Sequence, residues 1–207
     1  MIAIIDYGVG NLRSVEKALH FLGYEAAISS DKDFIKSADA VLLPGVGAFA
    51  DAMNNLKDTG MDKLVYDVAD SGKPFLGICL GMQMLFDYSE EGGYSKGLGL
   101  IPGSVRLLSD ELGLKVPHMG WNQLDVIRDA GVLQGLPEEA YVYFVHSYFV
   151  KAEKSSDVIA TTHYGVSFDV AVNRGNIYGT QFHPEKSGDV GMKILDNFAK
   201  IVEGNGI

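Results

Sequence analysis

Three residues of this chain have the types and spacing of a nucleophilic catalytic site. Cys79, the only cysteine, stands in the segment Gly77-Ile78-Cys79-Leu80-Gly81. His183 and Glu185 stand two residues apart in a later segment. A cysteine nucleophile needs a base that takes its proton and an acid that orients this base and stabilises its cation. Cys79, His183 and Glu185 are therefore candidates for a catalytic triad.

The residues before Cys79 predict a strand that ends at a sharp turn. Residues 75–78 form an apolar run, and the glycines on both sides let the backbone turn so that a nucleophile is presented at the carboxyl end of the strand. Open α/β sheets bind ligands at that edge. In an extended segment, side chains two residues apart point the same way, so we expect His183 and Glu185 to approach each other, with Pro184 stiffening the backbone between them.

Each half of this site has a simpler interpretation when it is taken alone. A lone cysteine in apolar surroundings is more often a buried, inert side chain, and a histidine in a loop is more often a surface residue. Their presence in one chain favours the triad. The remaining histidines are weaker candidates for a base: His20, His118, His146 and His163. With one cysteine and scattered histidines, the chain lacks the ligand spacing of a metal site, and no metal is expected.

The first half of the chain alternates between strand and helix patterns, which predicts an α/β fold with a mostly parallel central sheet and helices on both faces. The expected strands are 1–6, 25–29, 40–43 and 75–78. The expected helices are 12–22, a stretch through Met53 and Leu56, and 64–71.

The second half predicts a smaller mixed or antiparallel β portion packed on the first. Its expected strands are 97–101, 104–108, 116–119, a long aromatic strand 141–149, 158–163, 168–172 and 177–181. A closing helix is expected at 190–202. With 207 residues and 47% hydrophobic content, we expect one domain, residues 1–207.

Two glycine turns follow predicted strands. Gly8-Val9-Gly10 is similar to the start of a dinucleotide fingerprint, but Arg13 stands where the third glycine belongs, which favours a tight turn with Asn11 capping the next helix. Residues 44–47, Pro-Gly-Val-Gly, could bring backbone N–H groups close to a ligand or form an ordinary strand-to-helix turn. The residues alone leave both interpretations of this second turn open.

The composition bounds the partners and the compartment. A formal charge of −10 opposes nonspecific binding to nucleic acid or to an anionic membrane. The first residues lack a signal-peptide pattern, and no apolar run reaches membrane-spanning length. A single cysteine fits a reducing compartment, so a cytoplasmic protein is expected.

Together these residues resemble the class I (triad) glutamine amidotransferases, in which Gly-x-Cys-x-Gly is followed late in the chain by His-x-Glu. Residues 5–12, 117–122 and 143–148 are similar, within that class, to the family of glutaminase subunits of imidazole glycerol phosphate synthase. The resemblance implies a flavodoxin-like fold and the hydrolysis of L-glutamine to glutamate and ammonia through a Cys79 thioester, without a cofactor. It also implies a heterodimer with a (β/α)8-barrel cyclase subunit, which uses the ammonia to make imidazole glycerol phosphate and an aminoimidazole carboxamide ribonucleotide in histidine biosynthesis.

The resemblance also implies roles for individual residues. The oxyanion hole would be formed by Leu80, Val46 and Gly47, which moves the turn at 44–47 toward a functional interpretation. Glutamine would be bound by Gly47, Gln83, Glu91, Ser147 and Tyr148. The cyclase would be contacted by Asn11, Lys17, Met119, Trp121, Asn122, Tyr143, His146 and Lys186.

Three other functions are compatible with a triad. The chain could be the glutaminase subunit of another synthase, such as one making pyridoxal phosphate, anthranilate or guanylate. It could be a non-catalytic regulatory module that keeps the fold without turnover. A cysteine peptidase or another hydrolase is also chemically possible. The first is opposed by the segments 5–12 and 117–122, and the second by the complete triad.

Overall fold

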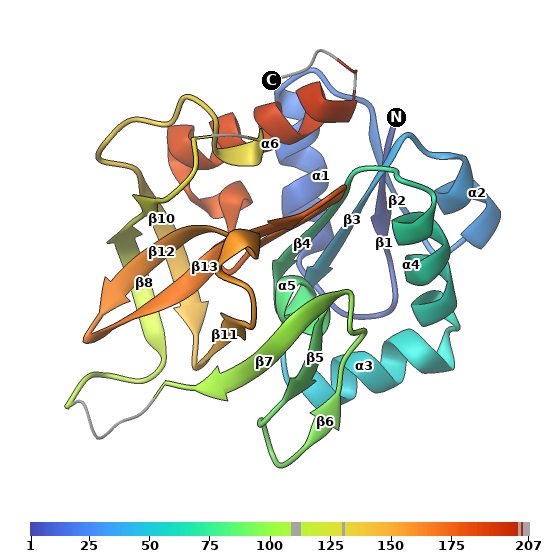
Figure 1. Cartoon of the computed structure of the whole chain (residues 1–207). Helices are drawn as coiled ribbons and strands as arrows, with labels where there is room; N and C mark the ends of the chain where they lie inside the picture. Colours follow the sequence, from blue (N-terminus) through green and yellow to red (C-terminus); the bar gives the residue numbers. More distant parts are fainter. Residues whose placement is uncertain (109–112, 130, 203, 205–207) are drawn as a thin grey trace.

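The computed structural model describes residues 1–108, 113–129, 131–202 and 204 (Figure 1). Its central sheet begins with parallel strands in the order β2, β1, β3, β4 and β14. These strands are β1 (Ile2–Ile5), β2 (Ala26–Ser29), β3 (Ala40–Gly45), β4 (Phe75–Cys79) and β14 (Ile177–Thr180). The order places β4, which carries Cys79, between β3 and β14, in the interior of the sheet.

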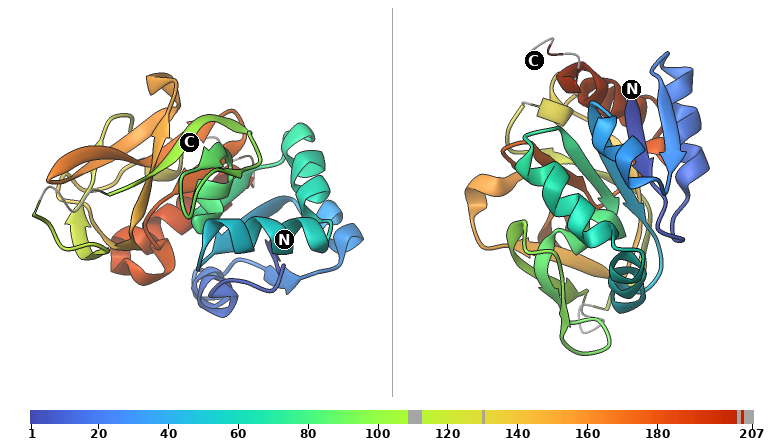
Figure 2. Two further views of the ribbon diagram at one scale, coloured as in Figure 1. Left: turned by 90° about the horizontal axis from the view of Figure 1, so that it is seen from below. Right: turned by 90° about the vertical axis from the view of Figure 1, so that its right-hand side faces the viewer.

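Helices cover both faces of the parallel strands (Figure 1, Figure 2). The first face packs against α1 (Leu12–Phe21) and α6 (Gly188–Val202), and the second against α2 (Lys32–Ser37), α3 (Phe49–Asp58) and α4 (Met61–Asp70). Strand β1 shows the reason, because Ile2 and Ile4 belong to the first cluster of buried side chains while Ala3 and Ile5 belong to the second. Successive side chains of a strand point to opposite faces, so an all-apolar strand is buried on both.

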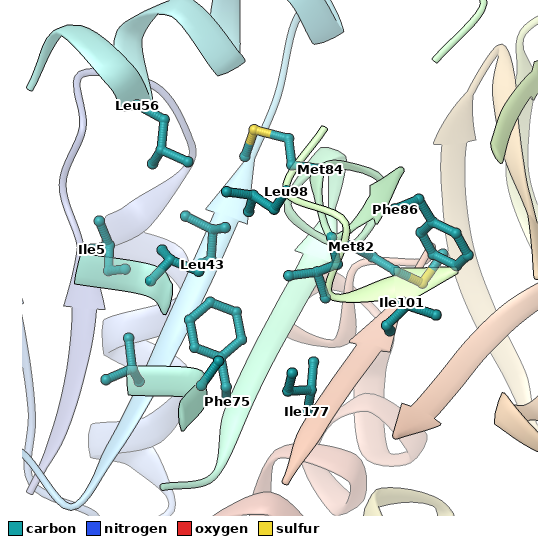
Figure 3. Packing of buried hydrophobic residues seen from close by; sticks show 14 of the residues in the cluster. Ile5, Leu43, Leu56, Phe75, Met82, Met84, Phe86, Leu98, Ile101 and Ile177 are labelled. Carbon is teal, nitrogen blue, oxygen red and sulfur yellow. The ribbon is translucent and has the colours of Figure 1, made fainter. Parts of the chain in front are cut away.

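The core on the α3–α4 side continues to the helix that follows Cys79. Leu43, Phe75 and Met82 are fully buried and lie together there (Figure 3). Each such side chain contributes about 1.5–3 kcal/mol when it leaves water. Met82 belongs to the short helix α5 (Leu80–Met84), so this packing fixes the helix that follows Cys79.

A mostly antiparallel portion extends the same sheet beyond β14. Its strands follow in the order β13, β11, β7, β5 and β6, and only β5 and β7 pair in parallel among the described strands of this portion. Strand β12 also pairs with β13, and β9 pairs with β12. Their bounds are β5 (Phe86–Ser89), β6 (Ser95–Lys96), β7 (Ile101–Leu107), β9 (Asp125–Val126), β11 (Tyr148–Ala152), β12 (Val158–Tyr164) and β13 (Val166–Arg174). The predicted α/β fold class is confirmed, with most of the antiparallel portion joined edge to edge to the parallel strands.

A separate two-stranded sheet flanks the large one, at the left of Figure 1. It consists of β8 (His118–Gln123) and β10 (Tyr141–His146), which we call the β8–β10 ribbon. The prediction of one strand over 141–149 is wrong. The chain leaves β10 at Ser147 because β10 pairs with β8 whereas β11 pairs with β7 in the large sheet.

Two other local predictions need correction. Residues 97–100 are not a strand, because their N–H groups donate to carbonyls of residues 84–87 rather than to a ladder. Asn11 stands at the N-cap of α1, but its side chain does not cap the helix and its Oδ1 accepts from Ser14 Oγ at 3.0 Å. Short 3₁₀ turns complete the described chain: Gly131–Leu133, Ser155–Asp157 and Pro184–Lys186. None of the described helices has the length and apolarity to cross a membrane.

Candidate active site

Cys79 occupies a strained turn between β4 and α5. Its φ of 55° and ψ of −112° make it the one non-glycine residue with positive φ in the described part of the chain. Such a conformation costs on the order of 1–3 kcal/mol and persists only where the surroundings impose it. The strand-turn-helix geometry is the one in which other enzymes present a nucleophile.

Glycines around Cys79 allow the backbones to approach closely. A Cβ at Gly81 would lie 1.7 Å from the Leu43 carbonyl oxygen, and a Cβ at Gly77 would lie 2.8 Å from the Gly81 carbonyl oxygen. A Cβ at Gly45 would lie 2.9 Å from the Gly81 backbone nitrogen. The Gly-x-Cys-x-Gly spacing is thus required by the packing of α5 against β3 and β4.

The structure brings the three candidate residues together. His183 Nδ1 lies 2.8 Å from Glu185 Oε1, and the two side chains are 3% and 1% exposed. The expectation was that both residues would lie in one extended segment. His183 is extended, but Pro184–Lys186 forms a 3₁₀ turn, and this turn folds Glu185 back beside His183. Cys79 and His183 line one cavity at the carboxyl ends of β4 and β14.

The charge of His183 depends on its two neighbours. Burial would lower the pKa of His183, but interactions with Cys79 and Glu185 outweigh burial and raise the pKa to about 9. Because Nδ1 of His183 faces the Glu185 carboxylate, Nδ1 carries a proton that it donates to Glu185 Oε1. His183 Nε2 makes no hydrogen bond to the residues described, so it is the nitrogen that can exchange a proton with Cys79 or a leaving group.

The cavity has a volume of about 410 Å³, within the usual range for small-molecule sites. Every residue that the resemblance assigns to glutamine binding lines it: Gly47, Gln83, Glu91, Ser147 and Tyr148. Leu80 and Val46, assigned to the oxyanion hole, line it too. The chain therefore gathers these residues around Cys79 from the turn after β3, from α5, from the loop after β5 and from the junction of β10 and β11.

The turn at 44–47 lies directly beside Cys79. Gly45 is the ladder partner of Cys79 in the β3–β4 pairing, so the residues that follow it reach the cavity. Val46 is 39% exposed, and Gly47 has a φ of +96°, which favours glycine. No described atom lies within 4 Å of a Cβ built at Gly47, so the turn is open on that side.

Glu91 already has one structural contact. Its Oε2 accepts a hydrogen bond from the Phe49 N–H at 2.8 Å, at the start of α3. A carboxylate is favourable at the N-terminus of a helix. This bond ties a residue of the cavity wall to the segment that follows the turn at 44–47.

Most residues assigned to the cyclase contact lie on the surface. Met119 and Trp121 are 60% and 57% exposed, and Trp121 meets its ladder partner Tyr143 edge to face, with 6.2 Å between the ring centroids. Lys17 and Lys186 are exposed, while Asn11, Asn122 and Tyr143 are half-buried. His146 differs, because its side chain is 6% exposed and lines the cavity.

Sequence reasoning missed two residues beside Cys79. Gln181 is fully buried and its Nε2 donates to Cys79 Sγ at 3.8 Å. The signal in the sequence was a polar amide, Gln181, at the end of a predicted strand that also carries the candidate base just after it. Tyr7 Oη donates to the Pro44 carbonyl at 3.1 Å, and burial together with the nearby Cys79 raises the pKa of Tyr7.

Comparisons with known proteins agree with this geometry. The model of the family "Glutamine amidotransferase class-I" matches residues 3–202, and the chain belongs to that family. Its curated relatives include "Imidazole glycerol phosphate synthase subunit HisH" from Geobacillus sp. (strain WCH70), 53% identical, with 100% of this chain and 99% of the relative covered. The subunit of the same name from Listeria monocytogenes serotype 4b (strain CLIP80459) is 51% identical, covering 98% and 96%. The predicted resemblance is confirmed.

Solved structures share the fold at lower identity. A putative GMP synthase protein from Thermoplasma acidophilum has a TM-score of 0.73 at 23% identity, covering 99% of this chain and 94% of that one. PurLQS from Thermotoga maritima has a TM-score of 0.77 at 20% identity, covering 97% and 98%. At these identities the likeness concerns the fold alone.

Proposed function

We propose that the chain, as one domain over residues 1–207, hydrolyses L-glutamine at Cys79 and delivers the ammonia to a cyclase subunit. One observation carries the proposal: Cys79 and His183, whose Nδ1 is paired with Glu185, open on a cavity of about 410 Å³ that is lined by the residues assigned to glutamine binding. The curated relatives named as subunits of imidazole glycerol phosphate synthase support the choice of partner. A thiol nucleophile that must stay reduced supports a cytoplasmic location.

The first half-reaction forms a thioester. Cys79 gives its proton to His183, and the thiolate attacks the side-chain amide carbon of glutamine. The tetrahedral oxyanion is stabilised by the N–H of Leu80 and by an N–H of the turn at Val46 and Gly47. His183, protonated at Nε2, then donates that proton to the amide nitrogen, the carbon–nitrogen bond breaks, and ammonia leaves.

The second half-reaction hydrolyses the thioester and regenerates the free enzyme. His183, now neutral, takes a proton from a water molecule, and the hydroxide attacks the thioester carbon. The carbon–sulfur bond breaks and glutamate leaves, while the proton on His183 restores the Cys79 thiol. Glu185 keeps the ring of His183 in one orientation and stabilises its cation in both steps.

The other cavity residues bind the amino-acid end of glutamine. Glu91 carries the negative charge that suits an α-ammonium group, and its Oε2 is already held by the Phe49 N–H. Gln83, Ser147, Tyr148 and Gly47 supply further polar groups along the cavity wall.

The docking face for the cyclase is the exposed side of the β8–β10 ribbon together with nearby lysines. Met119 and Trp121 form an apolar pair, and Lys186 lies next to the loop that carries His183. Exposed large apolar side chains beside a cavity are typical of a protein interface. A barrel seated there would receive ammonia and form the heterodimer.

The test is to mix the chain with the barrel cyclase and to measure glutamate and imidazole product from glutamine. We expect Cys79→Ala to abolish glutamate release while the same complex still makes product from free ammonium, which serves as the control for assembly. Glutamate release that survives Cys79→Ala would contradict the mechanism. Product only with a different synthase, or turnover of peptides or esters instead of glutamine, would favour the alternative functions.

A further inference from the structure

Two buried histidines face each other on the inner side of the β8–β10 ribbon. His118 and His146 are ladder partners, and His118 Nδ1 lies 3.0 Å from His146 Nε2. Their side chains belong to residues that are 3% and 6% exposed. The His118 ring stacks on Phe144 and Tyr164, with ring centroids 4.7 Å and 4.2 Å away, so its plane is fixed.

The hydrogen-bond partners of the two histidines show which ring donates and which ring accepts. His146 Nδ1 lies 2.8 Å from the Tyr148 carbonyl oxygen, which only accepts, so Nδ1 carries the proton. His146 Nε2 then accepts from His118 Nδ1–H. Burial lowers the pKa of His146 to about 3 and that of His118 to about 4, so both rings are neutral.

Asn122 fixes the outer end of the chain of hydrogen bonds. Its Nδ2 donates to the His163 carbonyl at 3.0 Å, and its Oδ1 accepts from the Gln123 N–H at 2.9 Å, so the amide has one orientation. The same Nδ2 lies 3.3 Å from His118 Nε2, which accepts. The donors therefore run one way, from Asn122 through His118 and His146 to the Tyr148 carbonyl.

The inner end of this chain is the wall of the cavity. The Tyr148 carbonyl accepts a second hydrogen bond from Gln83 Nε2 at 2.9 Å, and the same nitrogen donates to Gln181 Oε1 at 3.0 Å. Both amide hydrogens of Gln83 are thus committed, and its carbonyl oxygen remains to accept from an amino-acid substrate. Gln83, His146 and Tyr148 all line the cavity.

We propose that His118 and His146 are positioning residues that hold the Tyr148 carbonyl, and through it Gln83, in the orientation that binds glutamine. The proposal rests on the glutaminase function above. Two buried polar rings are costly unless they are hydrogen-bonded, and apolar rings would fill this aromatic site without that cost. The hydrogen bonds of the pair, rather than its volume, explain the choice of histidine.

Two substitutions at one position separate hydrogen bonding from packing. His118→Phe keeps a flat ring between Phe144 and Tyr164 but removes the Nδ1–H donor. His118→Asn loses the ring but keeps a donor, because Nδ2 of asparagine and Nδ1 of histidine are the same number of bonds from Cα. In the complex with the cyclase, we expect His118→Phe to raise KM for glutamine about tenfold with kcat within threefold, since the affected groups bind substrate in the ground state.

On a logarithmic scale, His118→Asn should recover at least half of the kcat/KM that His118→Phe loses relative to the wild type. A wild-type KM in His118→Phe, or a larger KM in His118→Asn than in His118→Phe, would overturn the proposal in favour of packing. Iodoacetamide alkylation of Cys79 at the wild-type rate checks that each variant is folded around the triad. If His118→Phe does not fold, the pair His146→Phe and His146→Asn makes the same comparison.

A spectroscopic measurement tests the direction of the chain without turnover. We expect ¹⁵N chemical shifts of the isolated protein at pH 7 to show both His118 and His146 as neutral Nδ1–H tautomers. A doubly protonated ring, or an Nε2–H tautomer at either position, would overturn the proposal. A wild-type complex that releases no glutamate would instead refute the glutaminase function. The two failures are distinguishable, because one is seen in the release of glutamate and the other in the tautomers of His118 and His146.

Discussion

The backbone N–H of His183 donates to the Tyr143 carbonyl at 3.1 Å, so the loop that carries the proposed base is bonded to the middle of β10. Ser187 completes the attachment. Its Oγ accepts from the Tyr143 N–H at 2.9 Å and donates to the His183 carbonyl at 2.6 Å. Because the ladder partner of Tyr143 is the exposed Trp121, one strand joins the proposed docking face to the proposed base.

Ser187→Ala is expected to lower kcat about tenfold and to change KM little. The substitution leaves the Tyr143 N–H without its partner and removes one of the two donors to the His183 carbonyl, which keeps the Lys186 N–H. The loss also costs about 1–3 kcal/mol of unfolding free energy. Steady-state kinetics and chemical denaturation measure the two effects. Ser37→Ala removes an exposed hydroxyl that bonds the Phe34 carbonyl, and it should leave both quantities unchanged. Equal kinetics in the two variants would show that the attachment does not position His183.

Glu185→Gln is expected to lower kcat about a hundredfold or more, because the amide no longer stabilises the His183 cation. The pair also contributes to stability in a pH-dependent way. The pKa of His183 is raised from 6.5 to about 9, so the protonated ring stabilises the folded state fully below pH 6.5, and this contribution is lost as the pH rises toward 9.

The wild type should therefore exceed Glu185→Gln in unfolding free energy by more at pH 6.5 than at pH 9, with a progressive decrease between the two. Denaturation at a series of pH values measures this difference, in which groups common to both proteins cancel. A difference that grew with pH would mean that Glu185 does not hold the proton on His183.

Gly81→Ala should destabilise the fold by at least about 3 kcal/mol, because its Cβ would lie 1.7 Å from the Leu43 carbonyl oxygen, a backbone atom that cannot move alone. Gly175→Ala is the matched control. Gly175 has a φ of +61° and open space around its Cβ, so alanine there costs only the backbone strain, about 1–2 kcal/mol. Similar losses in the two variants would argue that the contact with the Leu43 carbonyl is not what requires glycine at position 81.

The parts of the site that the sequence could predict are local ones. Gly77, Cys79 and Gly81 lie within five residues and specify their own turn, and His183 and Glu185 lie on one loop. The alternation of strands and helices likewise predicted the parallel sheet, because each element shows its own period.

The parts that it could not predict depend on register between distant segments. Gln181 reaches Cys79 across 102 residues, and His118 meets His146 across 28. The break at Ser147 is of the same kind, since the aromatic alternation of 141–149 continues while the pairing partner changes from β8 to β7. A one-residue slip in the pairing of β8 with β10 would place His118 and His146 on opposite faces of the ribbon.

The isolated chain is expected to hydrolyse glutamine slowly, because no hydrogen bond within the described residues fixes the N–H of Val46 or Gly47 in the turn at 44–47. Val46 is 39% exposed, and the space beside the Gly47 Cα is open. Within the described residues, the bonds of the turn lie at its two ends: Tyr7 Oη donates to the Pro44 carbonyl and Gly45 pairs with Cys79 at one end, and the Phe49 N–H donates to Glu91 at the other.

One missing oxyanion donor lowers the rate by about a hundred- to a thousandfold. We therefore expect glutamate release to rise by about this factor when the cyclase, with its own ligand bound, docks against Trp121 and Lys186 and orders the turn. Discontinuous assays of glutamate release, made on the isolated chain and on the complex, measure the ratio of the two rates. Alkylation of Cys79 by iodoacetamide, which forms no oxyanion, should proceed at similar rates in both states. If the isolated chain released glutamate as fast as the complex, the turn would already be ordered and the oxyanion hole complete without the partner.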